Sequence, residues 1–333
     1  MSLFKKPSEL TAKPGIVGMI YGQPGSGKST LACSAPGAVM LDYDGGVNRI
    51  NGAHQVPTLQ ISTWEQTAEA LAEIKATPEI QTVLIDTVGK QLAFMEEYIK
   101  RNVTFSKGGN PVEVNRDGSL SMKGFGRRKQ MFVDFIKEIT VIGKNVIFIA
   151  HDKEDKDGDN RYFRPDVGGS SATDLMRELD LVGYVQIIGT ERTITFTPTG
   201  AYYAKDTCGM PGIIPIPSLI NSDGVVVGEN NFFCKVIANY KNRIKSNLEN
   251  NRKLDSLKQE IDKNIELVTD ADSANNFVDW CKSIEHIYNS AAIAKSRISR
   301  KAKELGLTLD MTTKKYVKPA ESAKEETTDG SAA

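Results

Sequence analysis

Short apolar runs alternate with amphipathic stretches over the first two thirds of the chain. The clearest apolar runs have the length of strands and cover residues 15–21, 38–41, 82–85 and 145–150. Between them, apolar residues recur at helical spacing in residues 63–75, 88–100 and 125–142. Strands that alternate with helices are typical of a sheet whose strands are mostly parallel. The pattern therefore predicts an α/β fold with a mostly parallel central sheet.

The pattern changes near residue 231. From there the chain is mostly helical in spacing, with surfaces rich in Asn, Lys and Glu, and residues 274–288 have an apolar face. The last stretch is polar and has few apolar residues, which predicts disorder. The predicted organisation is a lead-in, an α/β core, a helical C-terminal region and a disordered tail, at residues 1–13, 14–230, 231–311 and 312–333.

The first candidate for chemistry lies between the strand at 15–21 and a helix start. It fits the pattern G-x-x-x-x-G-K-[ST], in which glycines let backbone N–H groups approach a phosphate. Lys28 can reach the β- and γ-phosphates of a nucleotide, and the Ser29 hydroxyl can bind Mg²⁺. The sequence therefore predicts an ATP site that uses the whole segment: Gly22, Gln23, Pro24, Gly25, Ser26, Gly27, Lys28, Ser29 and Thr30.

Polar side chains follow three further β-rich runs. Asp42 and Asp44 come after the strand at 38–41, Asp86 closes the strand at 82–86, and His151 follows the strand at 145–150. In an open α/β sheet these strand ends share one edge, where ligands bind. Asp44 is then a candidate to orient or deprotonate a water, and Asp86 a candidate to hold the metal with Ser29. His151 is a candidate to sense the γ-phosphate, or a structural histidine.

Composition limits the classes of partner and compartment. The formal net charge is zero, so a polyanion would have to meet a local basic patch. The four cysteines are scattered and read as reduced thiols. No apolar stretch approaches the roughly 20 residues of a membrane span, and the N-terminus lacks the apolar segment of a secretion signal. We expect a cytoplasmic protein with no membrane contact.

Two basic segments leave nucleic-acid contact open. Arg127, Arg128 and Lys129 fall in the expected first turn of the helix at 125–142, where cations oppose the helix dipole. They either meet a phosphate or form a solvated turn. The helix at 291–305 carries five cations and one acidic residue, and it either follows a phosphate backbone or is solvated.

The order of these motifs resembles a known family. The RecA core is resembled by four motifs in this order: the phosphate loop, the run Leu41-Asp42-Tyr43-Asp44-Gly45-Gly46, the run Val83-Leu84-Ile85-Asp86 and the strand before His151. Over residues 14–217 the chain is similar to the short RecA-like proteins of phages, which act in recombination as single-strand annealing proteins. Gly124-Phe125-Gly126 and Ala204-Lys205-Asp206 also look like that group.

The resemblance implies a function and roles for residues. It implies ATP hydrolysis with Mg²⁺ on single-stranded DNA, in a homo-oligomer within a bacterial host cell. Asp44 would be the catalytic carboxylate, His151 would report the γ-phosphate to the DNA-binding loops, and Lys205 would reach ATP across a subunit interface. The helical C-terminal third has no counterpart in that minimal core.

Two other functions remain open at the level of sequence. One is an ATP-gated loader or adaptor for a single-strand-binding protein or replication proteins, in which hydrolysis is not required. The other is a P-loop small-molecule kinase, with the hairpin around Arg161 and Arg164 as a lid.

Overall fold

The computed structural model describes residues 3–11, 15–157, 160–169 and 171–319. The chain forms two compact units, one of residues 13–243 and one of residues 1–12 with 244–333. The division falls within helix α6 (Phe232–Glu266) and not at the predicted boundary of 230/231. Parts of the predicted lead-in and most of the predicted tail, at 320–333, lie outside the described residues.

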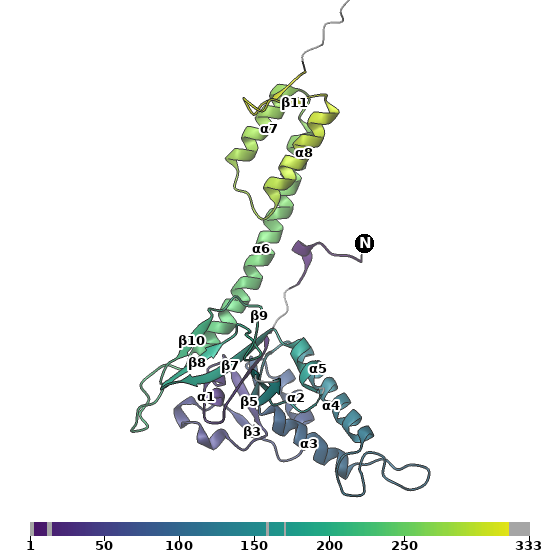
Figure 1. Cartoon of the computed structure of the whole chain (residues 1–333), viewed down its shortest axis with the longest axis vertical. Helices are drawn as coiled ribbons and strands as arrows, with labels where there is room; N and C mark the ends of the chain where they lie inside the picture. Colours follow the sequence, from purple (N-terminus) through teal and green to yellow (C-terminus); the bar gives the residue numbers. More distant parts are fainter. Residues whose placement is uncertain (1–2, 12–14, 158–159, 170, 320–333) are drawn as a thin grey trace, which may run out of the picture. The chain divides into compact units, whose positions relative to one another are not determined.

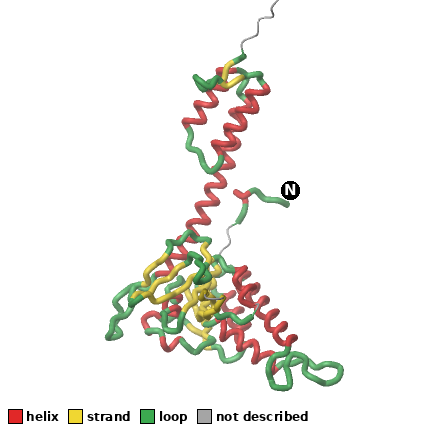
Figure 2. Tube along the Cα trace, in the orientation of Figure 1, coloured by secondary structure: helices red, strands yellow, loops and turns green. Residues whose placement is uncertain are grey.

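A ten-stranded sheet occupies the centre of the unit of residues 13–243, with helices around it (Figures 1 and 2). The strands are β1 (Val17–Gly22), β2 (Ala38–Asp42), β3 (Thr58–Gln60), β4 (Thr82–Asp86), β5 (Asn145–Asp157), β6 (Asn160–Pro165), β7 (Leu181–Ile188), β8 (Glu191–Thr195), β9 (Lys205–Asp206) and β10 (Ile213–Ile216). Their order is β10-β8-β7-β1-β5-β4-β2-β3, with β6 paired to β5 and β9 to β7. The six strands from β7 to β3 are parallel, so the predicted α/β fold with a mostly parallel sheet is confirmed.

Helices cover both faces of this sheet. One face packs its alternate residues, such as Val17, Met19 and Tyr21 of β1, against α2 (Glu65–Ala76), α3 (Val88–Arg101), α4 (Met122–Val141) and α5 (Ser171–Glu178). On the other face, α1 (Lys28–Ala32) packs against β1 and β5, and its end is bonded to the start of α6 through Ser34. Because both faces are covered, the central strands are continuous apolar runs and do not alternate with polar residues.

Short 3₁₀ turns at Val47–Arg49 and Gly52–His54 join β2 to β3. Strand β5 is longer than predicted, because it does not end at residue 150. It pairs with β1 and β4 up to about His151 and then forms an antiparallel hairpin with β6. The hairpin was expected from the sequence, although its tip at Gly158 and Asp159 lies outside the described residues.

The basic segment of α4 does not sit where the sequence predicted. The helix begins at Met122, and the Ser121 hydroxyl accepts a hydrogen bond from Gly124 N–H at 3.2 Å as its cap. Arg127, Arg128 and Lys129 therefore lie in the second turn, and the predicted conflict with the helix dipole is wrong. Their charges are paired within the protein, to Glu113, Glu96 and Asp174 respectively.

The C-terminal unit is mostly helical (Figure 2). Its elements are a 3₁₀ turn at Pro7–Glu9, the later part of α6, α7 (Ala271–Ser283), α8 (Ser290–Glu304), β11 (Thr308–Leu309) and β12 (Tyr316–Val317). Apolar side chains of α6, α7 and α8 share one core, which includes Ile261, Phe277 and Ile298. None of the described helices combines the length and apolarity needed to cross a membrane.

Two predictions in this unit are wrong at their ends. The helix expected at 274–288 stops at Ser283, because Ser290 starts α8 and its hydroxyl is bonded to His286 and to Ile287 N–H. The predicted start of the disordered tail, at residue 312, is also wrong. Tyr316 is buried and exchanges two hydrogen bonds with Asn275 of α7, so the described chain is ordered through β12.

We predict that Gly22→Ala destabilises the α/β unit. A Cβ at Gly22, where φ is +155°, would lie 2.1 Å from the carbonyl oxygen of Val185 in β7. That oxygen is part of the adjacent strand and cannot withdraw without disturbing the sheet, so the free energy of unfolding should fall by about 3 kcal/mol. Urea unfolding followed by Trp64 fluorescence in a Trp280→Phe background measures it.

The matched control is Gly126→Ala on α4, where an added Cβ meets no atom within 4 Å. Alanine suits a helix better than glycine, so this variant should be unchanged or up to about 1 kcal/mol more stable. Equal stability of the Gly22 and Gly126 variants would contradict the steric argument.

Candidate nucleotide site

The phosphate loop joins the C-terminal end of β1 to the N-terminal end of α1. Gly25 and Gly27 adopt φ angles of +78° and +87°, which glycine reaches without strain. Gly27 occupies the N-cap position of α1, and Ser26 N–H donates to the Gln23 carbonyl at 3.2 Å. Gln23 and Pro24 are exposed at the tip, whereas Ser26 is buried. The glycines thus curl the backbone into a loop whose N–H groups can surround an anion.

The Lys28 side chain lies inside this loop. Its Nζ donates to the carbonyl oxygens of Gly22 at 2.9 Å and Gln23 at 2.7 Å. Burial lowers the pKa of Lys28, and the nearby carboxylates of Asp152 and Asp86 oppose that shift. The ammonium is therefore a poorly hydrated cation that gains from any additional negative charge in the loop.

Asp86 and Ser29 form the pair that could hold a metal ion. Asp86 is 4% exposed, and its burial raises the carboxyl pKa from its ordinary 3.8 to about 6. A hydrogen bond with Ser29 and the charge of Lys28 oppose the rise, whereas Asp42 and Asp44 add to it. A hydroxyl and a carboxylate side by side suit Mg²⁺, which takes one or two protein oxygens and completes its shell with phosphates and water. The residues present therefore fit the metal.

Asp42 and Asp44 have different roles in the structure. The Asp42 carboxylate is 1% exposed and accepts backbone N–H groups of Asp44, Gly46 and Val47, each at 3.1 Å. It therefore shapes the turn after β2. The Asp44 side chain remains 18% exposed, 3.5 Å from Arg49, and it is near enough to Asp86 to raise its pKa. Of the two, Asp44 is the one placed for chemistry.

His151 lies on β5 directly beside the phosphate loop. It is in register with Gly22, the first residue of the loop. Burial and then the charge of Lys28 lower the pKa of the imidazole, which is therefore neutral at pH 7. Its Nδ1 is buried and has no hydrogen-bond partner. The sheet order, with β5 between β1 and β4, thus brings Lys28, Ser29, Asp44, Asp86 and His151 to one edge.

Lys205 and Thr30 are placed differently. Strand β9, with Lys205, pairs with the beginning of β7, at the edge of the sheet opposite the phosphate loop. Its Nζ donates to carbonyl oxygens of Leu179 and Met176 near the end of α5. The structure therefore does not bring Lys205 to the nucleotide site of its own chain, and the role across an interface stays a prediction. The Thr30 carbonyl oxygen accepts a hydrogen bond from Asn230 at 2.7 Å.

Two charged residues at the site were missed by sequence reasoning. Asp152, next to His151, is the carboxylate that acts most strongly on Lys28. Arg192 of β8 has a guanidinium nitrogen 3.4 Å from the point where a Cβ on Gly27 would lie. Within the described part of the chain Arg192 has no ion-pair partner. No local motif marks it, because only the pairing of β8 with β7, beside β1, brings it to the loop.

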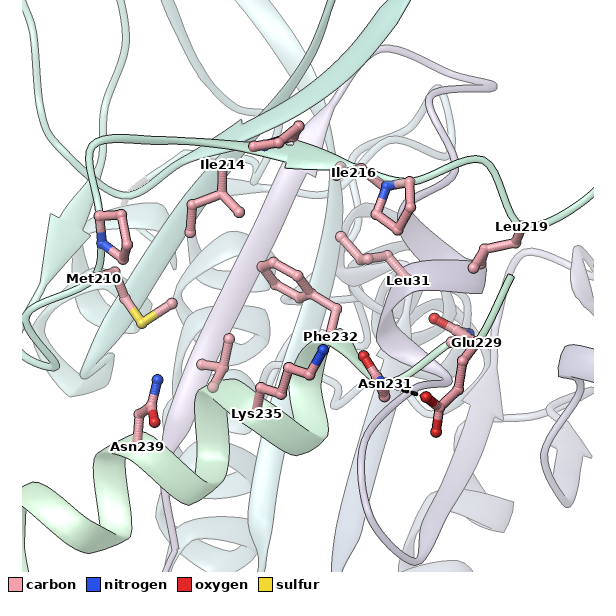
Figure 3. A pocket seen from close by; sticks show the side chains of 15 residues that line it. Leu31, Met210, Ile214, Ile216, Leu219, Glu229, Asn231, Phe232, Lys235 and Asn239 are labelled. Carbon is pink, nitrogen blue, oxygen red and sulfur yellow. Dashed lines mark hydrogen bonds between the residues drawn. The ribbon is translucent and has the colours of Figure 1, made fainter. Parts of the chain in front are cut away.

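Arg192 and residues of the phosphate loop line a pocket of about 620 Å³. Ser26, Gly27 and Thr30 form one wall, and residues 215–220 form the other. A smaller apolar pocket lies beyond Leu31, between β10 and the first turns of α6, with the Phe232 ring among its labelled side chains (Figure 3). The first pocket has the size and position for the nucleoside of a nucleotide whose phosphates lie in the loop.

Comparison with known proteins gives two findings. A family model described as an AAA domain matches residues 15–208, which run from β1 to β9 and include the loop, Asp44, Asp86 and His151. The chain is also similar to the SPbeta prophage-derived uncharacterized protein YorG of Bacillus subtilis (strain 168), with 25% identity over 221 residues. This match covers 62% of the chain and 62% of the relative, so the chain spans less than two thirds of the relative's length.

The raised pKa of Asp86 predicts a pH-dependent stability. Between about pH 4 and 6 the folded protein holds a proton on Asp86 that the unfolded chain has lost, so this contribution to the free energy of unfolding decreases as pH rises through about 6. Without metal or nucleotide, Asp86→Asn should match the wild type near pH 4 and exceed it by about 2–3 kcal/mol near pH 7.5. Urea unfolding at both pH values measures this.

Glu138→Gln, the same carboxylate-to-amide change on the exposed side of α4, is the control, and it should not show the gain in stability expected for Asp86→Asn near pH 7.5. If the metal-free Asp86→Asn protein were less stable than the wild type near pH 7.5, the buried carboxylate would not carry the cost assigned to it.

Proposed function

The chain belongs to the AAA-domain family of P-loop ATPases, and we propose that it hydrolyses ATP with Mg²⁺ and acts on single-stranded DNA in phage-type recombination or annealing. The observation that carries the ATPase proposal is the convergence of Lys28, the Ser29–Asp86 pair and Asp44 at one sheet edge. Transfer of a phosphoryl group to water needs a cation on the phosphates, oxygen ligands for a metal ion and a carboxylate that can reach the water. Lys28, the Ser29–Asp86 pair and the partly exposed Asp44 are groups of these three kinds.

Each group has a defined task in this proposal. Loop N–H groups and the Lys28 ammonium bind the β- and γ-phosphates, while Ser29 and Asp86 supply oxygens to Mg²⁺, which neutralises charge on those phosphates. Asp44 orients the attacking water and accepts its proton. His151 is neutral, so it can donate one hydrogen bond toward the γ-phosphate without adding charge.

The proposed action on DNA rests on separate observations. The order of motifs resembles that of the RecA-like phage proteins, and the relative in Bacillus subtilis is named as a prophage-derived protein. On α8 the exposed positions include Lys295, Arg300 and Lys303, which offer cations to a phosphate backbone. A homo-oligomer on DNA, with Lys205 reaching a neighbouring nucleotide, belongs to the same proposal.

An ATP-gated loader or adaptor for single-strand-binding or replication proteins is the second candidate. The helical unit favours it, since that unit has its own core and lies outside the matched AAA domain, as an attached partner-binding module would. The kinase hypothesis has less support. Arg161 and Arg164, the expected lid cations, pair with Glu154 and Asp155 of the same hairpin.

We predict that Lys28→Ala removes ATP hydrolysis and its stimulation by single-stranded DNA. Loss of a charged hydrogen-bond donor should weaken ATP binding by about 10–100-fold. Asp44→Asn should retain ATP binding and lower the hydrolysis rate by about 10²–10⁴-fold, because a general base is lost. Phosphate release and equilibrium ATP binding, each measured with and without DNA, test this.

Lys137→Ala, an exposed change on α4, is the control and should behave as the wild type. DNA that left the wild-type rate unchanged would count against the proposed action on DNA. Normal strand annealing or partner loading by the Asp44→Asn protein would favour the adaptor.

We predict that Arg192→Ala weakens ATP binding by about 10–100-fold, since it removes a cation that lies beside Gly27 and has no ion-pair partner in the described part of the chain. Arg116→Ala, an exposed change in the loop before α4, is the matched control. Titration with a fluorescent ATP analogue measures both. Equal affinities would remove Arg192 from the nucleotide site.

A further inference from the structure

A third pocket, of about 360 Å³, lies on the other side of His151 from the phosphate loop. Residues of α3, of the second turn of α4, of β5 and of the segment after β6 line it. Its polar lining comes from Thr87, Lys90, Glu96, Arg128, His151 and Asp166. The charge of Lys28 lowers the pKa of His151 and the charge of Asp166 raises it, so His151 is close to the nucleotide site and to this pocket.

The pocket contains the N-terminus of a long helix. Helix α3 has 14 residues, and Thr87 at its N-cap makes no side-chain capping bond. The first N–H to donate back into the helix is that of Gln91, to the Thr87 carbonyl at 2.9 Å. The N–H groups of the first turn are left for an outside acceptor, and the helix dipole favours a negative one.

An independent observation also points to a ligand. Thr87 is 3% exposed and lines the pocket, yet its hydroxyl Oγ1 has no hydrogen-bond partner. Buried hydroxyls are nearly always bonded. Arg128 Nε and His151 Nδ1, on two other elements around the pocket, are also buried without a partner. The Thr87 hydroxyl and Arg128 Nε are both hydrogen-bond donors, so two unused donors beside one pocket indicate an acceptor group that they would bind together.

The charges select the kind of group. Arg128 pairs with Glu96, so much of its charge is already balanced. Lys90 is exposed, and no ion pair involves it among the residues described. Asp166 also lines the pocket, and its negative charge offsets that of Lys90 in the total. The remaining attraction comes from the helix N-terminus and the unused donors. The positive potential that remains in the pocket is small, so it suits a group with one negative charge better than a phosphomonoester dianion.

We propose that this pocket binds one phosphodiester group of a single-stranded DNA backbone, with Thr87, Lys90 and the first turn of α3 as its donors. The inference rests on the proposed action on DNA and adds where the strand meets the ATPase unit. Because His151 lies between this phosphodiester and Lys28, it is the side chain that can relay occupancy from one site to the other.

The test measures DNA affinity with the nucleotide site filled. Protein saturated with Mg²⁺ and a non-hydrolysable ATP analogue is titrated into fluorescent oligothymidylate over a range of salt concentrations. Nucleotide occupancy is checked for every variant. Lys90→Gln should weaken DNA binding about tenfold and reduce the slope of log affinity against log salt by about 0.7, the value for one lost phosphate contact on a single strand.

Thr87→Val separates the hydroxyl from the charge. It keeps the shape of the side chain and should weaken binding by about threefold to tenfold with no change in the salt slope, since no ion contact is lost. Lys100→Gln is the control at the far end of the same helix, where the lysine pairs with Glu97, and it should change neither quantity.

The outcomes distinguish the two levels of proposal. A wild-type protein that binds the analogue but no DNA overturns the action on DNA and this site together. A wild type that binds DNA, with Lys90→Gln equal to it in affinity and in salt slope, overturns the pocket alone. An affinity loss in Lys90→Gln without a change in slope also overturns it, because the lost contact would then not be ionic.

Discussion

The desolvation of opposite charges beside the phosphate loop is the constraint on which the site depends. Lys28 and Asp86 are both buried, and burial moves the pKa of each toward its neutral form. Their mutual attraction and the hydrogen bonds from Ser29 and to the loop carbonyls offset part of that cost. A ligand that brings phosphate to the Lys28 ammonium and a divalent cation to the Asp86 carboxylate stabilises both buried charges. Binding therefore removes part of the desolvation cost that the unliganded fold carries.

The fold holds these charges through the order of its strands. Strand β5 lies between β1 and β4, so His151 is beside Gly22 while Asp86 reaches the same edge one strand further on. Asp42 uses its carboxylate entirely on backbone N–H groups and so holds Asp44 toward solvent. The buried Asp42 thus has a structural role and positions Asp44. The partly exposed Asp44 is the one of the two that is available for chemistry.

The cations of the α/β unit follow a similar division. On α4 and on the β5–β6 hairpin, every arginine is paired to an acidic neighbour, as is Lys129, and these pairs serve the fold. Arg192 and Lys90 also lie at pockets, the two pockets beside the phosphate loop and His151, and neither has an ion-pair partner among the described residues. They lie on opposite sides of the phosphate loop and His151, Arg192 toward the proposed nucleoside pocket and Lys90 toward the start of α3.

The sequence alone was sufficient for the phosphate loop, the four main strand ends and the α/β class, because all of these depend on local pattern. A glycine loop between a strand and a helix, and apolar runs closed by Asp, carry their meaning within a few residues. The start of α4 and the end of α7 were not predicted, although short-range hydrogen bonds of Ser121 and Ser290 mark them. The order in β12 was not predicted either, since it depends on Asn275, a partner far away in the chain. Arg192, the burial of Asp86 and the unbonded Thr87 hydroxyl depend on which strands become neighbours. Only tertiary structure decides that, because strand pairing joins residues far apart in the chain and no local spacing encodes it.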